Sequence, residues 1–139
     1  MNALVDTSVW SLMLRRKPED LGVAERPVVA ELAELIREGR VRIIGLVRQE
    51  MLSGVKTPAR YERLRGALRA FSDESIDTSD YEGAARAFNL CRSKGVVASV
   101  VDALICQIAL ARQWSIFTID PDFEHYARAL SIHLHALRR

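Results

Sequence analysis

Apolar positions along the chain follow two spacings that alternate from one end to the other. Short apolar runs typical of buried strands occur at residues 3–5, 41–45 and 115–118, with a weaker strand signal at 75–77 and a last one at 132–134. Between them, apolar residues recur every three or four positions, as they do on one face of a helix. Short strands that alternate with helices indicate a mainly parallel sheet covered on both faces, so we predict an α/β fold.

Seven helical segments are predicted between these strands. Pro58 is typical of a helix start, whereas Gly39 and Gly54 mark helix ends. The apolar stripes that define the helices lie at residues 10–14, 28–36, in a short segment around residue 50, at 61–71, 81–91 and 101–108, and in a short segment before the last strand. His133 and His135 alternate with apolar neighbours, so we predict that both lie on the solvent face of an edge strand.

Composition places the chain among ordinary globular proteins. Its 139 residues, 49% hydrophobic and 27% charged, predict one domain over residues 1–139. No apolar run has the length of a membrane span and the N-terminus lacks the layout of a signal peptide, so a cytoplasmic protein without membrane contact is expected. Cys91 and Cys106 lack metal-ligand spacing and are predicted to be buried, reduced thiols. The net charge of +2 is too small to attract nucleic acid by itself.

Four acidic residues follow strand ends or begin helices in this arrangement. Asp6 and Asp120 come directly after predicted strands. Glu50 lies in the helix after another strand, and Asp102 lies in the first turn of its helix. Because ligand sites of open parallel sheets form at the carboxyl ends of the strands, this topology can bring all four together. Carboxylate oxygens suit Mg²⁺ or Mn²⁺, so the sequence predicts a metal site and metal-dependent phosphodiester chemistry.

Each acid also has an ordinary structural interpretation. Ser99 and Asp102 have the spacing of a helix capping box, Asp120 before Pro121 is typical of a helix N-cap, and Asp6 suits the same role. Gathered together, however, four carboxylates repel one another, and without a cation at least one would stay protonated. The set as a whole therefore favours a metal site. Hydroxyl groups beside the acids are expected to orient carboxylates or water, namely those of Thr7, Ser8 and Thr118.

Four ordered segments resemble the PIN-domain family, and within it the VapC-type toxins of toxin–antitoxin pairs. They are Leu4-Val5-Asp6-Thr7-Ser8-Val9-Trp10, Gln49-Glu50-Met51-Leu52-Ser53-Gly54, Asp102-Ala103-Leu104-Ile105 and Thr118-Ile119-Asp120-Pro121-Asp122-Phe123. No single segment is specific, but their order and the chain length match, so the resemblance covers essentially the whole chain. It implies a PIN-like three-layer α/β/α fold with a short, mainly parallel central sheet.

The same resemblance implies a toxin that acts as an Mg²⁺- or Mn²⁺-dependent endoribonuclease and leaves 5′-phosphate ends. It also implies a small VapB-like antitoxin and a homodimer. Carried over position by position, the catalytic and metal-binding acids are Asp6, Glu50, Asp102 and Asp120. Family members differ over which acid of the last segment serves, so Asp122 is an alternative; we favour Asp120 because it lies closer to the strand end.

RNA requires a positively charged approach to an acidic site, and several arginines are candidates for it. Arg48 lies within one turn of Glu50, and Arg15 and Arg16 follow the first helix. For each of them a solvated helix face is the alternative. Candidates for an apolar antitoxin groove, with core packing as the alternative, are Trp10, Met13, Leu14, Tyr61, Leu64 and Leu68.

Three other functions fit parts of the pattern. A phosphotransfer protein also carries acids at strand ends. A haloacid-type phosphatase, however, has the motif Asp-x-Asp-x-Thr, and Ser8 stands here at the position of the second Asp. A receiver domain has a lysine after a late strand, and this chain has no lysine there. A non-catalytic PIN-like module that binds RNA or protein is disfavoured because all four acids are present. A PIN nuclease of RNA processing is disfavoured by the small size of the chain.

Overall fold

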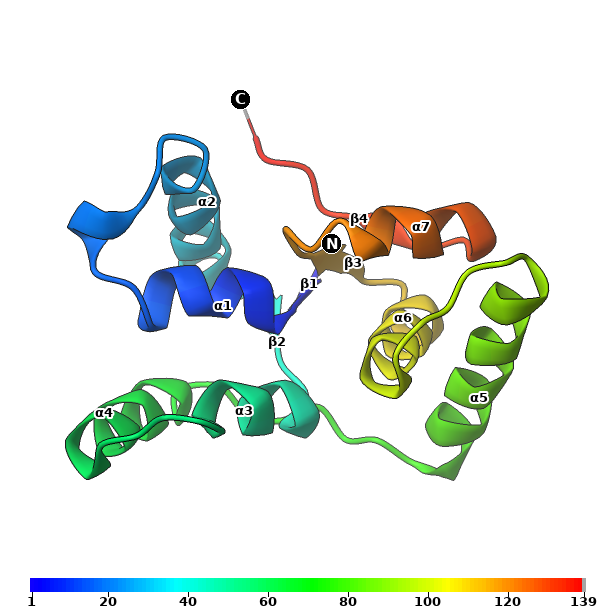
Figure 1. The fold of residues 1–139 in the computed structure, drawn as a ribbon, viewed down its shortest axis with the longest axis horizontal. Coiled ribbons are helices and arrows are strands. Elements are labelled where there is room, and N and C mark those ends of the chain that lie inside the picture. Colours follow the sequence, from blue (N-terminus) through cyan, green and yellow to red (C-terminus); the bar gives the residue numbers. More distant parts are fainter. Residues whose placement is uncertain (139) are drawn as a thin grey trace.

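A four-stranded parallel sheet forms the centre of the computed structural model, which describes residues 1–138 (Figure 1). The strands are β1 (Ala3–Val5), β2 (Val41–Arg42), β3 (Ser115–Phe117) and β4 (His133–Leu134). Their spatial order is β2-β1-β3-β4, and each neighbouring pair runs parallel. Leu4 is paired with Arg42 on one side and with Ile116 on the other. The predicted mainly parallel sheet is confirmed.

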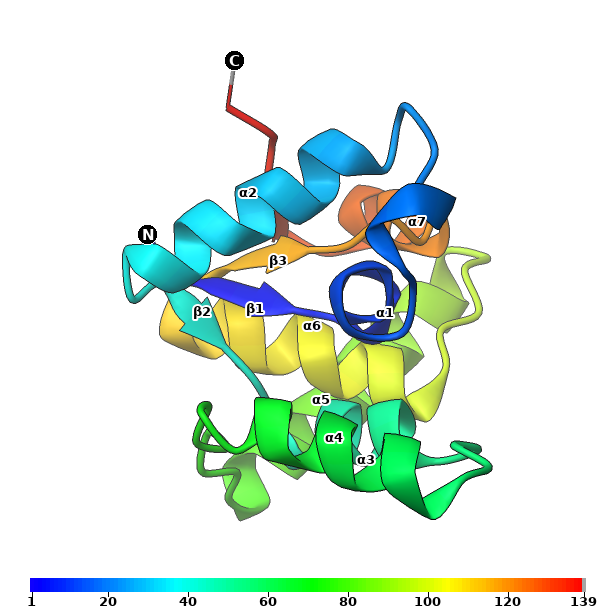
Figure 2. The same ribbon diagram turned by 90° about the vertical axis from the view of Figure 1, so that its left-hand side faces the viewer.

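Helices cover both faces of this sheet. Those of residues 1–138 are α1 (Thr7–Leu14), α2 (Arg26–Arg37), α3 (Gly45–Leu52), α4 (Pro58–Leu68), α5 (Thr78–Ser93), α6 (Val100–Arg112) and α7 (Asp122–Ala129), with a short 3-10 helix at Pro18–Asp20. Figure 2 shows α2 above the strands and α6 below them, with α1 seen end-on where β1 ends. The three-layer α/β/α arrangement is therefore confirmed.

Capping side chains set the starts of several helices. Thr57 accepts a hydrogen bond from the backbone of Arg60 and caps α4, while Ser99 accepts one from the backbone of Asp102 and caps α6. At the other end of α2, Gly39 has a φ of 68°, a left-handed conformation that glycine adopts without a steric penalty. The cap of α6 is the predicted ordinary role of Ser99, and it coexists with the placement of Asp102 described below.

The core lies between the sheet and the helices. All three residues of β1 are fully buried, as expected for a central parallel strand. Trp10 is also fully buried, with its ring 5.0 Å from that of Phe71 in an edge-on contact. Leu68 is buried as well, so Trp10 and Leu68 belong to the core and not to an open groove. Cys91 and Cys106 are buried free thiols, as predicted.

The predicted strand at 75–77 is wrong, and the strand at 41–45 is shorter than predicted. Instead of a strand at 75–77, the described residues have an isolated parallel bridge between Ile43 and Asp73, just before that segment. The backbone groups of this segment have other partners, because the carbonyl of Ser75 accepts from Arg112 and the N–H of Asp77 donates to a side chain of α5. Strand β2 stops at Arg42 because α3 begins at Gly45.

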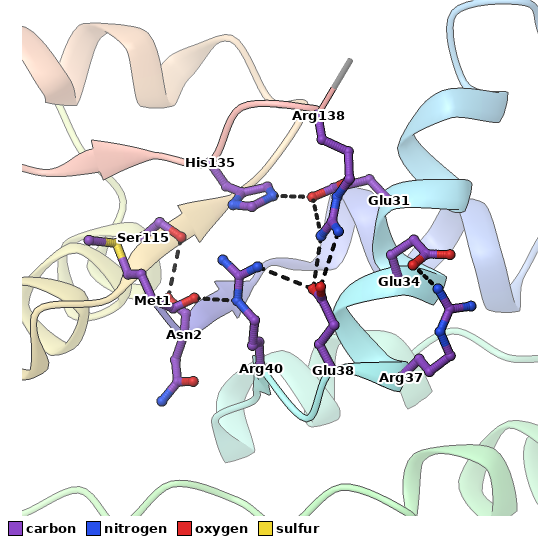
Figure 3. Close-up of polar contacts among 10 residues, drawn as sticks. All are labelled: Met1, Asn2, Glu31, Glu34, Arg37, Glu38, Arg40, Ser115, His135 and Arg138. Carbon is purple, nitrogen blue, oxygen red and sulfur yellow. Dashed lines mark hydrogen bonds and ion pairs between the residues drawn. The ribbon is translucent and has the colours of Figure 1, made fainter.

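The solvent-facing position predicted for His135 is also wrong. Strand β4 ends at Leu134, so the alternation of strand residues does not continue to His135. Its side chain is 11% exposed, and Nε2 lies 2.5 Å from Oε2 of the buried Glu31 of α2 (Figure 3). Arg138 donates to the same carboxylate at 2.7 Å and to Glu38 at 2.9 Å. This cluster fastens the end of the described chain to α2.

Among residues 1–138, no helix combines the length and the apolar character needed to cross a membrane.

Candidate metal centre

The candidate site is built around Asp6, at the carboxyl ends of β1 and β3. Asp6 follows β1 directly, caps α1 and is 5% exposed. Its Oδ1 accepts hydrogen bonds from the backbone N–H and the hydroxyl of Ser8, at 2.7 and 2.6 Å. Its Oδ2 accepts from the hydroxyl of Thr118, which follows β3, at 2.6 Å. The carboxylate of Asp6 thus links the carboxyl ends of β1 and β3, which are far apart in sequence.

The donors around Asp6 favour its ionised form. The Ser8 hydroxyl accepts from the backbone N–H of Ile119 at 3.0 Å, and the Thr118 hydroxyl accepts from that of Asp120 at 3.0 Å. Each hydroxyl hydrogen is therefore free to point at Asp6, which must accept both. A carboxylate has about four lone-pair sites, and these contacts take three of them.

Three further carboxylates form a cluster that does not include Asp6. Single oxygens of Asp102, Asp120 and Asp122 all lie within 4.8 Å of one another. Asp102 is in the first turn of α6, Asp120 is in the loop after β3, and Asp122 is the first residue of α7. The backbone N–H of Asp122 donates to Oδ1 of Asp120 at 2.9 Å. The structure thus brings both acids of the last segment to Asp102, including Asp122, which the sequence offered only as an alternative.

Burial and mutual repulsion act on these acids. Burial raises the pKa of Asp6, and hydrogen bonds from its two hydroxyl neighbours oppose the rise without cancelling it. The pKa of Asp102 is also raised by burial, against hydrogen bonds from Tyr126 and Ser99, and the charges of Asp120 and Asp6 raise it further. The negative charge collected here is thus unfavourable by itself. An all-oxygen carboxylate set of this kind fits a hard divalent cation such as Mg²⁺ or Mn²⁺.

Glu50 lies apart from the three clustered acids. It is an exposed residue of α3, and its Oε1 accepts a hydrogen bond from the hydroxyl of Thr7 at 3.1 Å. Thr7 is the first residue of α1 and follows Asp6 directly. Glu50 therefore borders the site from the α3 side, and Thr7 orients it.

Tyr126 is the residue of this site that the sequence reasoning missed. Its hydroxyl donates to Oδ2 of Asp102 at 2.7 Å, and its side chain is 2% exposed. Burial and the adjacent Asp102 raise the pKa of this phenol above its usual range. A tyrosine on the buried face of a helix needs a partner for its hydroxyl, and this requirement is the only hint in the sequence that Tyr126 contacts a polar residue. The pattern could not say which residue, 24 positions away, is that partner.

The family model of the PIN domain matches residues 3–129. The chain belongs to the PIN-domain family.

Solved structures share the fold of this PIN domain. FitAcB from Neisseria gonorrhoeae is 20% identical, with 96% of each chain covered and a TM-score of 0.75. VapBC2 from Rickettsia felis, bound to a DNA fragment from their promoter, is 15% identical, with 97% of this chain and 98% of the other covered and a TM-score of 0.75. A toxin–antitoxin complex from Klebsiella pneumoniae is 19% identical, with 88% and 90% covered and a TM-score of 0.62. No curated protein matches the chain.

Arg48 is held by contacts within the PIN domain. Its Nε donates to Asp73 at 2.9 Å and its Nη1 to the carbonyl of Leu68 at 2.9 Å, while Nη2 contacts the carbonyl of Phe71. The side chain is 19% exposed. These contacts join α3 to the end of α4. They favour a structural role for Arg48 over the RNA contact expected from its sequence position.

Arg15 and Arg16 also have partners within the protein. Arg15 reaches the carboxyl end of α3, where Nη2 donates to the carbonyls of Glu50 at 2.9 Å and Ser53 at 3.4 Å. A cation at this end of a helix is favourable because the helix dipole is negative there. Arg16 pairs with Glu25 at 3.0 Å and is about half exposed. Both side chains nevertheless line a groove on the surface.

That groove lies between α1 and α4 and has a volume of about 650 Å³. Its apolar part includes Met13, Leu14 and Leu64. Basic side chains also line it, namely those of Arg15, Arg16, Lys17, Arg60 and Arg63. An apolar floor with a cationic rim suits a partner that carries both apolar and acidic groups.

Proposed function

We propose that this PIN domain is a metal-dependent endoribonuclease and the toxin of a type II toxin–antitoxin pair. The observation that carries the proposal is the cluster of Asp102, Asp120 and Asp122 at the carboxyl end of a parallel sheet. The likeness to solved toxin–antitoxin structures supports the biological part of the proposal. The action is proposed to take place in the cytoplasm.

The residues of the site divide the chemical work between them. Asp102, Asp120 and Asp122 would hold Mg²⁺ or Mn²⁺, and the charge of Asp6 acts on Asp102. The bound ion supplies Lewis-acid activation of water and of the phosphoryl group. We assign to Glu50 the acceptance of a proton from the attacking water, because it is exposed and is oriented by Thr7. Attack by water leaves a 5′-phosphate and a 3′-hydroxyl.

RNA is proposed to approach over the basic rim of the groove. Within residues 1–138, the side chains of Lys17, Arg60 and Arg63 form no ion pair or hydrogen bond, so they are available for phosphate contacts. The apolar floor formed by Met13 and Leu14 is proposed to receive apolar side chains of an antitoxin segment whose acidic groups meet the rim. An antitoxin seated there would neutralise the toxin by covering the RNA approach.

A homodimer is the remaining part of the proposal. A hollow of about 300 Å³ among α3, α5 and α6 is lined mainly by apolar side chains, among them Phe88 and Val100. Val100 is 78% exposed, and the partner protomer is proposed to cover it together with the apolar hollow. Light scattering on the purified chain measures the oligomeric state, and Val100→Asp is expected to shift it to monomer.

The nuclease proposal is tested on purified protein free of any antitoxin. Wild type and Asp6→Asn are incubated with total cellular RNA in Mg²⁺, in Mn²⁺ and in EDTA, and the 5′ ends of the fragments are mapped. Asp20→Asn is the matched control, because it removes the same charge from an exposed position in the 3-10 helix. We expect discrete cuts with 5′-phosphates from wild type and Asp20→Asn only, and none in EDTA.

The other outcomes are equally informative. Absence of cleavage by folded, metal-loaded wild type contradicts the nuclease and leaves a module that binds RNA or protein. Cleavage that survives in Asp6→Asn contradicts the assignment of this site.

A further inference from the structure

Helix α7 contributes two polar side chains, one helical turn apart, to the carboxylate cluster. Asp122 begins the helix and brings an oxygen within 4.8 Å of those of Asp102 and Asp120. Tyr126 lies four residues later on the same face and donates to Oδ2 of Asp102 at 2.7 Å. Helix α7 thus supplies both a carboxylate of the cluster, from Asp122, and a hydrogen-bond donor to Asp102, from Tyr126.

We infer that Tyr126 is a positioning residue that holds the carboxylate of Asp102 in the orientation needed for the cation. The inference rests on the proposed function of this site. Its physical basis is the crowding of carboxylates at Asp102, one oxygen of which lies within 4.8 Å of oxygens of Asp120 and Asp122. A carboxylate on a flexible side chain turns away from such neighbours unless a donor holds it in place.

The phenol is well suited to this task because it is itself immobile. Tyr126 is 2% exposed, and its ring lies 5.1 Å from that of Phe123 in an edge-on contact. Asp102 is anchored at its backbone, whose N–H donates to the Ser99 hydroxyl at 3.0 Å. Asp102 is therefore held at its backbone by the start of α6 and at its carboxylate by the middle of α7. Cation binding then requires little rearrangement of Asp102.

The experiment compares cation affinity with fold stability in single variants. Tyr126→Phe removes the hydroxyl and keeps the ring, and Tyr81→Phe is the matched control at an exposed tyrosine of α5. Mn²⁺ is titrated into each metal-free protein, and the free ion is followed by electron paramagnetic resonance. Thermal unfolding in EDTA shows that each variant is folded. We expect Tyr126→Phe to raise the Kd for Mn²⁺ at least about tenfold, as loss of such outer partners typically does, and Tyr81→Phe to leave it unchanged.

Asp102→Asn, measured in the same way, distinguishes a failure of the role of Tyr126 from a failure of the proposed metal centre. If wild type binds Mn²⁺, Asp102→Asn does not, and Tyr126→Phe binds within twofold of wild type, the role of Tyr126 is refuted and the metal centre stands. If wild type binds no Mn²⁺, or if Asp102→Asn binds as wild type does, the metal centre itself is refuted.

Discussion

Replacement of Arg48 by Ala tests whether this residue holds the fold together or contacts RNA. The sequence places Arg48 beside Glu50, whereas the structure places its guanidinium against Leu68, Phe71 and Asp73. Leu68 is the last residue of α4, so the cation also lies at the negative end of that helix. The structural role predicts a loss of stability, and the RNA role predicts a loss of affinity.

The size of the stability loss follows from the three contacts. A hydrogen bond to a charged group contributes about 1.5–3 kcal/mol, and water replaces part of it when the side chain is removed. The pair with Asp73 adds at most about 1 kcal/mol, because that carboxylate is 44% exposed and screened by solvent. We therefore expect the free energy of unfolding to fall by about 2–4 kcal/mol. A domain with a typical total of about 5–15 kcal/mol stays folded after such a loss.

Urea denaturation followed by circular dichroism, in EDTA at pH 7, measures this quantity for wild type and Arg48→Ala. Arg60→Ala is the matched control, because its side chain lines the groove and makes no ion pair within residues 1–138. Its stability is expected to stay within about 0.5 kcal/mol of wild type. Fluorescence anisotropy of labelled RNA in EDTA then gives the binding affinity, which we expect to weaken for Arg60→Ala and to stay unchanged for folded Arg48→Ala. An Arg48→Ala protein as stable as wild type, with RNA affinity reduced tenfold, refutes this reasoning.

Two further predictions concern charge. Burial favours protonation of Glu31, but hydrogen bonds and charges of Arg138 and His135 outweigh it and lower its pKa below the ordinary 4.5. The stability that ionised Glu31 contributes is thus fully present above about pH 4.5, and it is lost as the pH falls through the lowered pKa. The difference in unfolding free energy between wild type and Glu31→Gln should therefore shrink in acid. A difference that stays constant between about pH 7 and pH 3 contradicts this prediction. Because burial raises the pKa of Asp102, Asp102→Asn in EDTA at pH 7 should unfold at or above the wild-type temperature. With Mn²⁺ at a hundred times its Kd, wild type alone should gain about 2.7 kcal/mol; an equal gain in both proteins argues against the centre.

Much of the fold was predictable because its determinants are local. The apolar runs at 3–5 and 115–118 form β1 and β3, since consecutive buried positions are what a central parallel strand requires. The weak signal at 75–77 gave a wrong strand, because its polar backbone groups found partners in Arg112 and α5. A short polar segment specifies its pairing weakly, and tertiary contacts then decide it.

The candidate site divides in the same way. Asp6 and Asp120 were identifiable because each follows a strand directly, and parallel strands end at a common edge. The role of Arg48 was not identifiable, because its partners lie 20 to 25 residues later and only the packing of α3 on α4 brings them within reach.

The sequence by itself determined the central strands β1 and β3, the helices between the strands and which acids stand at strand ends, because those properties depend on neighbours along the chain. Only the tertiary structure decided which side chains became partners. Tyr126 meets Asp102 across 24 residues, and His135 meets Glu31 across 104. The physical reason is that periodicity specifies the face on which a side chain lies, whereas a hydrogen bond requires a partner within about 3 Å, and that distance is set by the packing of whole elements.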